Sequence, residues 1–168
     1  MPTVIVITKG NGEDDIAITR ADGSKALTRF PHKGPVPHDA VHFFVERGLG
    51  MRRGFWGTVF DGMHPEHIGA LAKAAGHASA SRAQVPDQSI VELIQAERLV
   101  ECFEADLWGG GGSDEDLVAV AEAGCAASFV DMPAIVPVAV SQIRGELAEF
   151  ARSWTAAPLG HEALLRWE

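Results

Sequence analysis

The sequence contains no tyrosine, two cysteines and no apolar run that approaches the roughly 20 residues needed to cross a bilayer. The absence of tyrosine removes the phenol as a catalytic acid or base. Two cysteines make no disulfide framework, so we expect both as reduced thiols. The chain also starts without the basic and apolar regions of a secretory signal. These absences predict a cytoplasmic protein that neither spans nor binds a membrane.

Several catalytic motifs are absent as well. No Gly-x-Ser-x-Gly elbow is present to hold a nucleophilic serine, and both cysteines fall within predicted helices among apolar residues, where thiols are usually inert. No Gly-x-Gly-x-x-Gly follows a predicted strand, which argues against a nucleotide cofactor. No Glu-x-x-His occurs, which argues against a ferritin-like metal site. The sequence alone therefore identifies no reaction.

Basic residues are also few, because 14 lysines and arginines stand against 23 aspartates and glutamates, for a net charge of −9. Such a charge argues against general nucleic-acid binding and against binding to anionic membranes. Within residues 85–131, Arg98 is the only base among eleven acidic residues. This segment predicts an acidic helical face. Three interpretations are open: the face is simply solvated, it binds a basic protein partner, or its carboxylates converge on a cation. A second copy of the chain is the other partner that we consider.

Residues 1–30 are typical of a three-stranded antiparallel meander. Residues 3–9 form a continuous run rich in β-branched side chains, which favours a buried strand. The turn signals Asn11-Gly12 and Asp22-Gly23 separate this strand from the two that follow. A meander alone leaves an open edge, so residues 161–168 are predicted to be a closing strand.

Residues 37–157 predict a cluster of four to six helices. Pro37 stands in a first turn, where the missing N–H of proline is tolerated. Asp87 is predicted to cap a long helix, and Ser113 with Asp116 resembles a capping box. The other predictions are a short aromatic helix or turn over residues 51–62, a helix over 64–76, a loop over 78–86 and a helix with an apolar stripe over 140–154. The sequence thus predicts a single α+β domain over residues 1–168, with the meander packed on the helices.

His38, His42 and Glu46 are the strongest candidates for chemistry. A helix that begins at Pro37 turns by about 100° per residue, which places these three side chains on one ridge. Two imidazoles at this spacing bind a divalent metal such as zinc, and a carboxylate one turn further on is a suitable third ligand. The string His-Asp-x-x-His also resembles the zincin pattern His-Glu-x-x-His, with the shorter Asp39 in place of glutamate. No other cofactor is predicted.

A structural role for the same residues is the simpler interpretation. The apolar face of this helix is centred between Val41 and Val45, and both His38 and His42 lie at its boundary. A histidine at such a position commonly packs its ring and bonds to a backbone carbonyl. Glu46 lies about 125° from the centre of the face and is expected to point to solvent. A hydrogen-bonded pair and a catalytic histidine without metal therefore stand beside the metal site as alternatives.

Arg47, Arg52 and Arg53 lie near Trp56 in the only cluster that is both basic and aromatic. Arginine offers forked donors and tryptophan a stacking face, so the cluster is a candidate site for a small anion. The alternative is that the aromatic side chains belong to the core while the arginines pair with the acidic half of the chain.

Glu97, Glu101 and Glu104 lie within about 60° of one another on the long predicted helix. Carboxylate ridges of this kind build metal sites in helical bundles when histidines accompany them in Glu-x-x-His motifs. No such motif accompanies this ridge. The absence of this motif therefore argues against a ferritin-like metal site at these three glutamates.

The block Val-Pro-His-Asp-Ala-Val-His-Phe-Phe-Val-Glu over residues 36–46, followed by Arg-Gly-Phe-Trp-Gly over 53–57, resembles an uncharacterised family of small bacterial proteins. The resemblance implies a bacterial cytoplasmic protein and brings neither an activity nor a catalytic residue. The function that the sequence favours is a non-enzymatic cytoplasmic binding or interaction module with an acidic helical face. A metal-dependent, hydrolase-like enzyme is the alternative, and small-anion binding is the third candidate.

Overall fold

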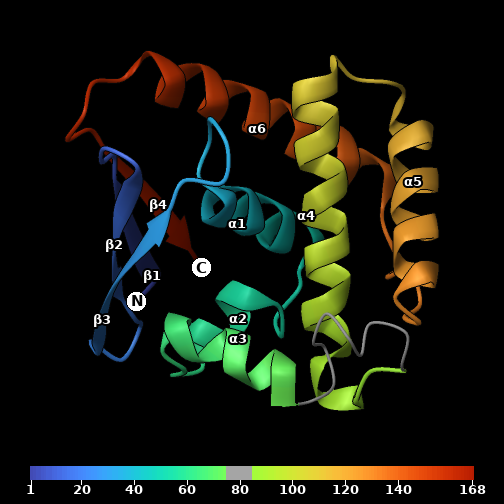
Figure 1. Cartoon of the computed structure of the whole chain (residues 1–168), viewed down its shortest axis with the longest axis horizontal. Helices are drawn as coiled ribbons and strands as arrows, with labels where there is room; N and C mark the ends of the chain where they lie inside the picture. The colour runs from blue at the N-terminus through green and yellow to red at the C-terminus, as the bar shows by residue number, and fades with distance from the viewer. Residues whose placement is uncertain (75–84) are drawn as a thin grey trace.

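The computed structural model describes residues 1–74 and 85–168 and has an α+β fold. A four-stranded antiparallel sheet lies at one end of the molecule, and the helices extend away from it (Figure 1). The predicted fold class is confirmed. In chain order the elements are β1 (Thr3–Thr8), β2 (Glu13–Thr19), β3 (Lys25–Pro31), α1 (His38–Leu49), α2 (Phe55–Phe60), α3 (Pro65–Ala74), the 3-10 turn η2 (Gln88–Ile90), α4 (Val91–Gly109), α5 (Asp114–Ala127), α6 (Pro137–Ala156) and β4 (Glu162–Trp167).

The predicted closing strand is present as β4. The sheet has the order β3-β2-β1-β4, and each neighbouring pair is antiparallel. β4 runs beside β1 so that Thr3 is opposite Trp167 and Thr8 is opposite Glu162. Alternate side chains of each strand point to the inner face, where Ile5 is completely buried. β4 thus covers the edge of β1 that the meander alone would leave open.

α1 and α2 pack against the inner face of the sheet. The ring of Trp167, at the end of β4, lies 5.8 Å from that of Phe43 on α1 and 5.1 Å from that of Phe60 on α2. Arg20, which follows β2, donates from Nε to the carbonyl of Val59 in α2 at 2.6 Å. Burial of these large rings fixes the orientation of both helices on the sheet.

α1 is the central helix of the molecule. Figure 1 shows it between the sheet and α4, and it contacts both α4 and α6. α5 packs on α4, and α6 runs back toward the sheet with most of its predicted apolar stripe buried. None of the helices in the described ranges combines the length and apolar character of a membrane span. The packing leaves one side of α1 facing α4.

Local signals in the sequence set several helix starts. Ser113 accepts from the backbone N–H of Asp116 and the Asp116 carboxylate accepts from the backbone N–H of Ser113, both at 3.1 Å, so the predicted capping box is formed. Asp87 is a cap as predicted, but the element that it caps is η2, and α4 follows. The predicted helix end at Gly76 and most of the predicted loop over 78–86 lie outside the described residues.

Candidate metal centre

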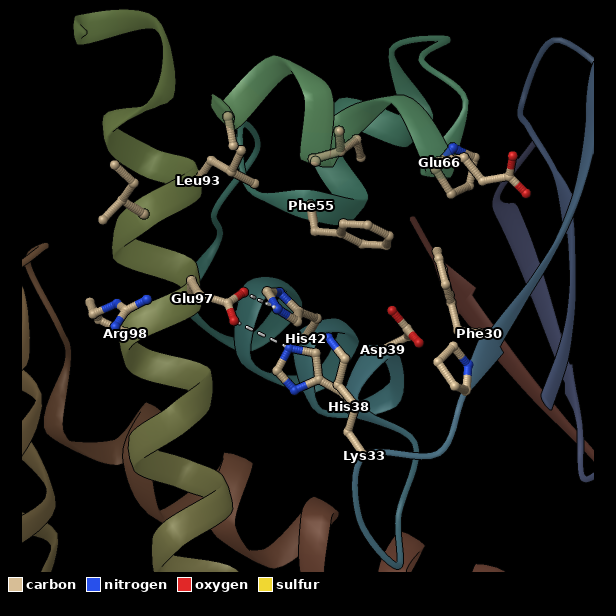
Figure 2. Close-up of a pocket in the computed structure, with 16 residues that line it drawn as sticks. Phe30, Lys33, His38, Asp39, His42, Phe55, Glu66, Leu93, Glu97 and Arg98 are labelled. Atoms are coloured by element: carbon tan, nitrogen blue, oxygen red, sulfur yellow. Dashed lines mark hydrogen bonds and ion pairs between the residues drawn. The ribbon is translucent and has the colours of Figure 1, made fainter. Parts of the chain in front are cut away.

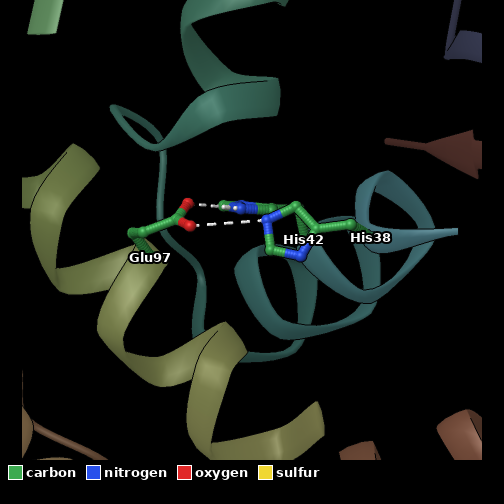
Figure 3. A group of neighbouring side chains, drawn as sticks. All are labelled: His38, His42 and Glu97. Carbon is green, nitrogen blue, oxygen red and sulfur yellow. Dashed lines mark hydrogen bonds and ion pairs between the residues drawn. The ribbon is translucent and has the colours of Figure 1, made fainter. Parts of the chain in front are cut away.

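Two neighbouring helices bring the candidate residues together. His38 and His42 lie one turn apart on α1, on the side that faces α4 (Figure 3). Glu97 projects from α4 into the space between the two helices and meets both imidazoles. The apolar face of α1 is occupied by contacts within the core, so the residues at its boundary are left to face α4. The result is a cluster of two histidines and one carboxylate from two helices.

His42 has a carboxylate on each ring nitrogen. Its Nδ1 lies 2.9 Å from Oε1 of Glu46, one turn further along α1, and its Nε2 lies 2.9 Å from Oε2 of Glu97. The side chain is only 2% exposed, and its ring packs 5.6 Å from that of Phe55. A buried imidazole that is bonded at both nitrogens has a fixed orientation, and its Nε2 edge is directed at Glu97.

His38 repeats this arrangement. Its Nδ1 lies 2.7 Å from Oε1 of Glu104, which follows Glu97 by two turns on α4. Its Nε2 lies 3.4 Å from Oε1 of Glu97, and the ring centroids of the two histidines are 4.8 Å apart. Both Nε2 atoms therefore converge on one carboxylate, while each Nδ1 atom is held by a different carboxylate behind it.

The ligand atoms of His38, His42 and Glu97 all lie within 4.8 Å of one another, which is close enough to hold one metal ion. This set keeps the two histidines of the predicted ridge and has Glu97 in place of Glu46. The sequence argues only against a ferritin-like site at Glu97, because that motif requires a histidine on the same helix, and it does not pair Glu97 with the histidines of α1. The role of Glu97 could have been predicted by placing the histidine ridge of one helix opposite the glutamate ridge of another.

Glu46 points inward, so the expectation that it faces solvent is wrong. Its exposed fraction is 0%. Besides His42, its carboxylate accepts hydrogen bonds from the backbone N–H groups of Phe55 at 2.8 Å, Trp56 at 2.9 Å and Gly57 at 3.4 Å. Glu46 is buried because the start of α2 covers this side of α1. Glu46 thus anchors the start of α2 and orients His42.

The carboxylates keep both histidines protonated. Burial by itself lowers the pKa of His42, but the hydrogen bonds with Glu46 and Glu97 outweigh burial and raise that pKa to about 10. Burial opposes protonation of His38 as well, while the bonds with Glu104 and Glu97 raise its pKa to about 9. Burial also raises the pKa of Glu97, yet the bonds from both histidines hold it well below its ordinary value of 4.5. Protons therefore supply the positive charge at the centre of the cluster.

The cluster forms part of the wall of a cavity of about 380 Å³ (Figure 2). This volume lies within the range of small-molecule sites. The rings of Phe30 and Phe55 line the cavity with their centroids 6.3 Å apart. Asp39 also lines it, and burial raises the pKa of this carboxyl above its ordinary value of 3.8. Further apolar lining residues are Pro31, Pro65, Ile68, Ala72, Leu93 and Ile94.

The predicted anion site at the arginines is not assembled. Trp56 is completely buried and donates from Nε1 to a backbone carbonyl of α1 at 2.8 Å, so it offers no stacking face to a ligand. Arg47 forms an ion pair with Glu146 of α6 at 2.6 Å. Arg52 and Arg53 are exposed. The prediction for Trp56 is wrong because α2 packs on the sheet, and a tryptophan in such a helix becomes part of the core.

The acidic segment over residues 85–131 is bonded internally to a large extent. Arg144 of α6 binds two of its carboxylates, Arg98 binds a third, and the two histidines of α1 bind two more. Backbone N–H groups bind others at turns and helix starts. The acids with these partners are Asp87, Glu92, Glu97, Glu101, Glu104, Asp106, Asp114 and Asp116. The segment therefore offers less open negative charge than its composition indicates.

Comparison with known proteins adds no assignment to this picture. No family model, no curated protein and no solved structure matches the chain. The resemblance of the 36–46 and 53–57 blocks to a family of small bacterial proteins stays a prediction. Inference about function therefore rests on the chemistry of the cluster and of the cavity beside it.

Proposed function

We propose that the protein binds one divalent ion of the zinc class through His38, His42 and Glu97 and is a metal-dependent enzyme of hydrolase type. One observation carries the proposal. Both Nε2 atoms meet at the carboxylate of Glu97, while Glu104 and Glu46 hold the two Nδ1 atoms. Metal-binding histidines almost always have such a second partner, which fixes the tautomer and raises the basicity of the ligand nitrogen.

The residue types also suit this chemistry. Two imidazoles and one carboxylate form a common ligand set of catalytic zinc, which keeps a fourth position for water. The three candidate ligands line the cavity, whereas Glu46 and Glu104 lie behind the rings. The fourth position would therefore open toward the cavity and a bound substrate. A zinc ion supplies hydroxide at neutral pH and polarises a carbonyl group, which is the chemistry of hydrolysis.

The test is titration of the untagged protein with zinc, followed by calorimetry and elemental analysis. We expect one zinc per chain and the release of about two protons for each ion at neutral pH, because the metal replaces the protons of two histidines. Calorimetry in buffers of different ionisation enthalpy measures these protons. His42→Ala and Glu97→Gln should lose stoichiometric binding. Glu104→Gln should bind about 10- to 100-fold more weakly, which is the usual effect of an outer carboxylate.

His161→Gln is the matched control, because His161 is exposed and lies outside the cluster. It should bind zinc as the parent does. An ion-pair network that serves only to stabilise the fold would bind no stoichiometric zinc, and this result would overturn the proposal. The hydrolase part is tested with p-nitrophenyl acetate. We expect zinc-dependent hydrolysis by the parent and none by His42→Ala, and an inert zinc-loaded parent would contradict that part alone.

A further inference from the structure

We infer that the cavity beside the histidine cluster binds a small apolar or aromatic amine, with its ammonium group paired to Asp39 and its hydrocarbon part beside Phe30 and Phe55. This cavity is the one that the three proposed metal ligands line. The binding of the amine is independent of the metal. Only the interpretation of the amine as a substrate rests on the proposed function.

Asp39 is the first reason for this inference. Figure 2 shows its carboxylate directed from α1 into the cavity, in the space between the two histidines and Phe30. Within the described residues, no other residue donates a hydrogen bond to this carboxylate, and no lysine or arginine forms an ion pair with it. The carboxylate accepts a bond from its own backbone N–H, and the nearby charges of His42, His38 and Lys33 act on it from beyond ion-pair distance. A half-buried carboxylate with no partner from another residue has lost hydration that one local bond only partly replaces. A cationic ligand that reaches this group supplies the missing partner.

The walls of the cavity are the second reason. The rings of Phe30 and Phe55 line the space next to Asp39, and aromatic faces attract cations as well as hydrocarbon. Ile68 and Leu93 extend the apolar lining on the side of α3 and α4. A volume of about 380 Å³ accommodates a phenyl ring with a short arm. The ligand that fits is therefore mainly apolar and carries a single positive group.

The charges around the cavity favour a cation over an anion. Glu66 adds a further carboxylate to the lining, and the lysine of the lining, Lys33, is exposed. Arg98 also lines the cavity, but it projects from the side of α4 away from the histidines and its charge is paired with Glu101 at 2.9 Å (Figure 2). The histidines add no net positive charge, because their two protons are set against three bonded carboxylates, those of Glu46, Glu97 and Glu104. A carboxylate ligand would meet repulsion from Asp39 in the same space.

The test compares three probes of nearly equal shape, namely benzylamine, benzyl alcohol and benzoate. Calorimetric titrations use both the metal-free and the zinc-loaded protein. We expect benzylamine to bind at least about 10-fold more tightly than benzyl alcohol in the metal-free protein, and benzoate to bind most weakly. In Asp39→Asn, benzylamine should fall to the affinity of benzyl alcohol, whose own binding should persist and report that the cavity is intact.

Asp61→Asn is the matched control, because Asp61 is exposed and does not line the cavity. It should keep the full preference for benzylamine. If Asp39→Asn does not fold, Asp39→Ser provides a second removal of the charge. Equal affinities of the parent for benzylamine and benzyl alcohol would overturn the inference. A preference that survives in both Asp39 variants would overturn it too.

The same experiment separates this inference from the proposed function. A metal-free protein that prefers benzylamine through Asp39 supports the inference even if zinc does not bind. A protein that binds zinc at His38 and His42 but shows no preference keeps the metal centre and loses the amine site. A preference that appears only with zinc and is independent of Asp39 would mean that the amine ligates the metal, and this result also overturns the inference.

Discussion

Two charged clusters join α4 to its neighbours, and they differ in the nature of their cation. Toward α5 and α6, Arg144 binds Asp106 through Nε at 2.9 Å and Nη2 at 3.0 Å, and Asp114 through Nη1 at 2.7 Å. Toward α1, the cations are His38 and His42. Arginine keeps its charge at every pH that a folded protein meets, whereas a histidine is cationic only while it is protonated. One cluster is therefore fixed in charge and the other is exchangeable.

The difference shows what the buried histidines provide that an arginine would not. Burial of charged groups costs hydration free energy that ion pairing only partly returns, so a buried cluster is a poor device for stability alone. The Arg144 cluster links three helices and is partly exposed, with 24% of the Arg144 side chain accessible, whereas His42 and Glu46 at the centre of the other cluster are 2% and 0% accessible. The histidine cluster holds protons that the proposed metal ion would replace, with Glu97 as its carboxylate ligand and Glu46 and Glu104 still bonded to the imidazoles. This property fits a ligand site better than a simple link between helices.

The largest loss of stability is expected from the removal of Glu46, which belongs to the histidine cluster and not to the Arg144 cluster. Glu46→Ala leaves the N–H groups at the start of α2 and one nitrogen of His42 without a partner in a buried position. We expect a loss of about 3 to 5 kcal/mol in the free energy of unfolding, the usual result of breaking a buried pair on one side. Urea denaturation measures this loss.

Glu149→Ala is the control for Glu46→Ala, because Glu149 is an exposed glutamate of α6. Its free energy of unfolding should stay within about 0.5 kcal/mol of that of the parent, as for most surface changes. A similarly small loss in Glu46→Ala would mean that water replaces its carboxylate. That result would contradict the burial of Glu46.

The second effect is a dependence of stability on pH that distinguishes the two clusters. The pKa values of His38 and His42 are raised from 6.5 to about 9 and about 10 in the folded protein. Their stabilisation of the metal-free protein is therefore complete below pH 6.5 and is lost as the pH rises through those values. The lowered pKa of Glu97 acts in the other direction, since its contribution is present above about pH 4.5 and is lost on acidification. We expect the free energy of unfolding to fall by about 2 kcal/mol or more between pH 6.5 and pH 10, because a tenfold change in proton affinity corresponds to about 1.4 kcal/mol.

Unfolding by urea at several pH values checks this slope. A protein with both His38→Gln and His42→Gln should show a much flatter profile over the same range, while Arg144 stays charged because its bonds with Asp114 and Asp106 raise its pKa further. Zinc should reverse the slope of the parent, since metal binding strengthens as the histidine protons leave. Equal slopes in the parent and the double variant would show that the histidines are not the groups that titrate.

The smallest loss of stability is expected from a change in the Arg144 cluster. Arg144→Gln removes ion pairs that solvent and salt partly screen, so its cost should be at most about 1 kcal/mol. The cost should shrink further as the salt concentration rises, because the screening length shortens. The cost should not change between about pH 6 and about pH 9, because arginine keeps its charge over that range. A large cost that is insensitive to salt would place Arg144 in the same class as the buried histidines.

The meander and the helix starts could be predicted because their signals are local. Asn11-Gly12 and Asp22-Gly23 form the turns of the meander. The pairing of β4 with β1 is not local, and the open edges of the meander predict only that a further strand joins it. The capping box at Ser113 acts within four residues of chain. Asp87 shows the limit of such signals, because a cap marks a helical start without fixing whether the first turn is 3-10 or α.

The sequence predicted only part of the candidate site, namely its two histidines. The spacing of His38 and His42 follows from the helical repeat, and both residues belong to the cluster. Glu97 could not be assigned, because nothing in the sequence states which face of α4 meets α1. The inward position of Glu46 depends on α2 folding over α1, and the burial of Trp56 depends on the same contact. Periodicity within one helix describes the faces of that helix, whereas the partner of each face is decided by packing between helices.

The place of β4 in the sheet has a consequence for the synthesis of the chain. β2 and β3 leave the ribosome soon after β1 and can pair at once, since tight turns join them. β4 follows only after all the helices have been made, so one edge of β1 stays uncovered during most of translation. Trp167, which contacts both α1 and α2, arrives with that last strand. The nascent chain therefore holds every residue of the histidine cluster before it holds the strand that completes the sheet beneath α1.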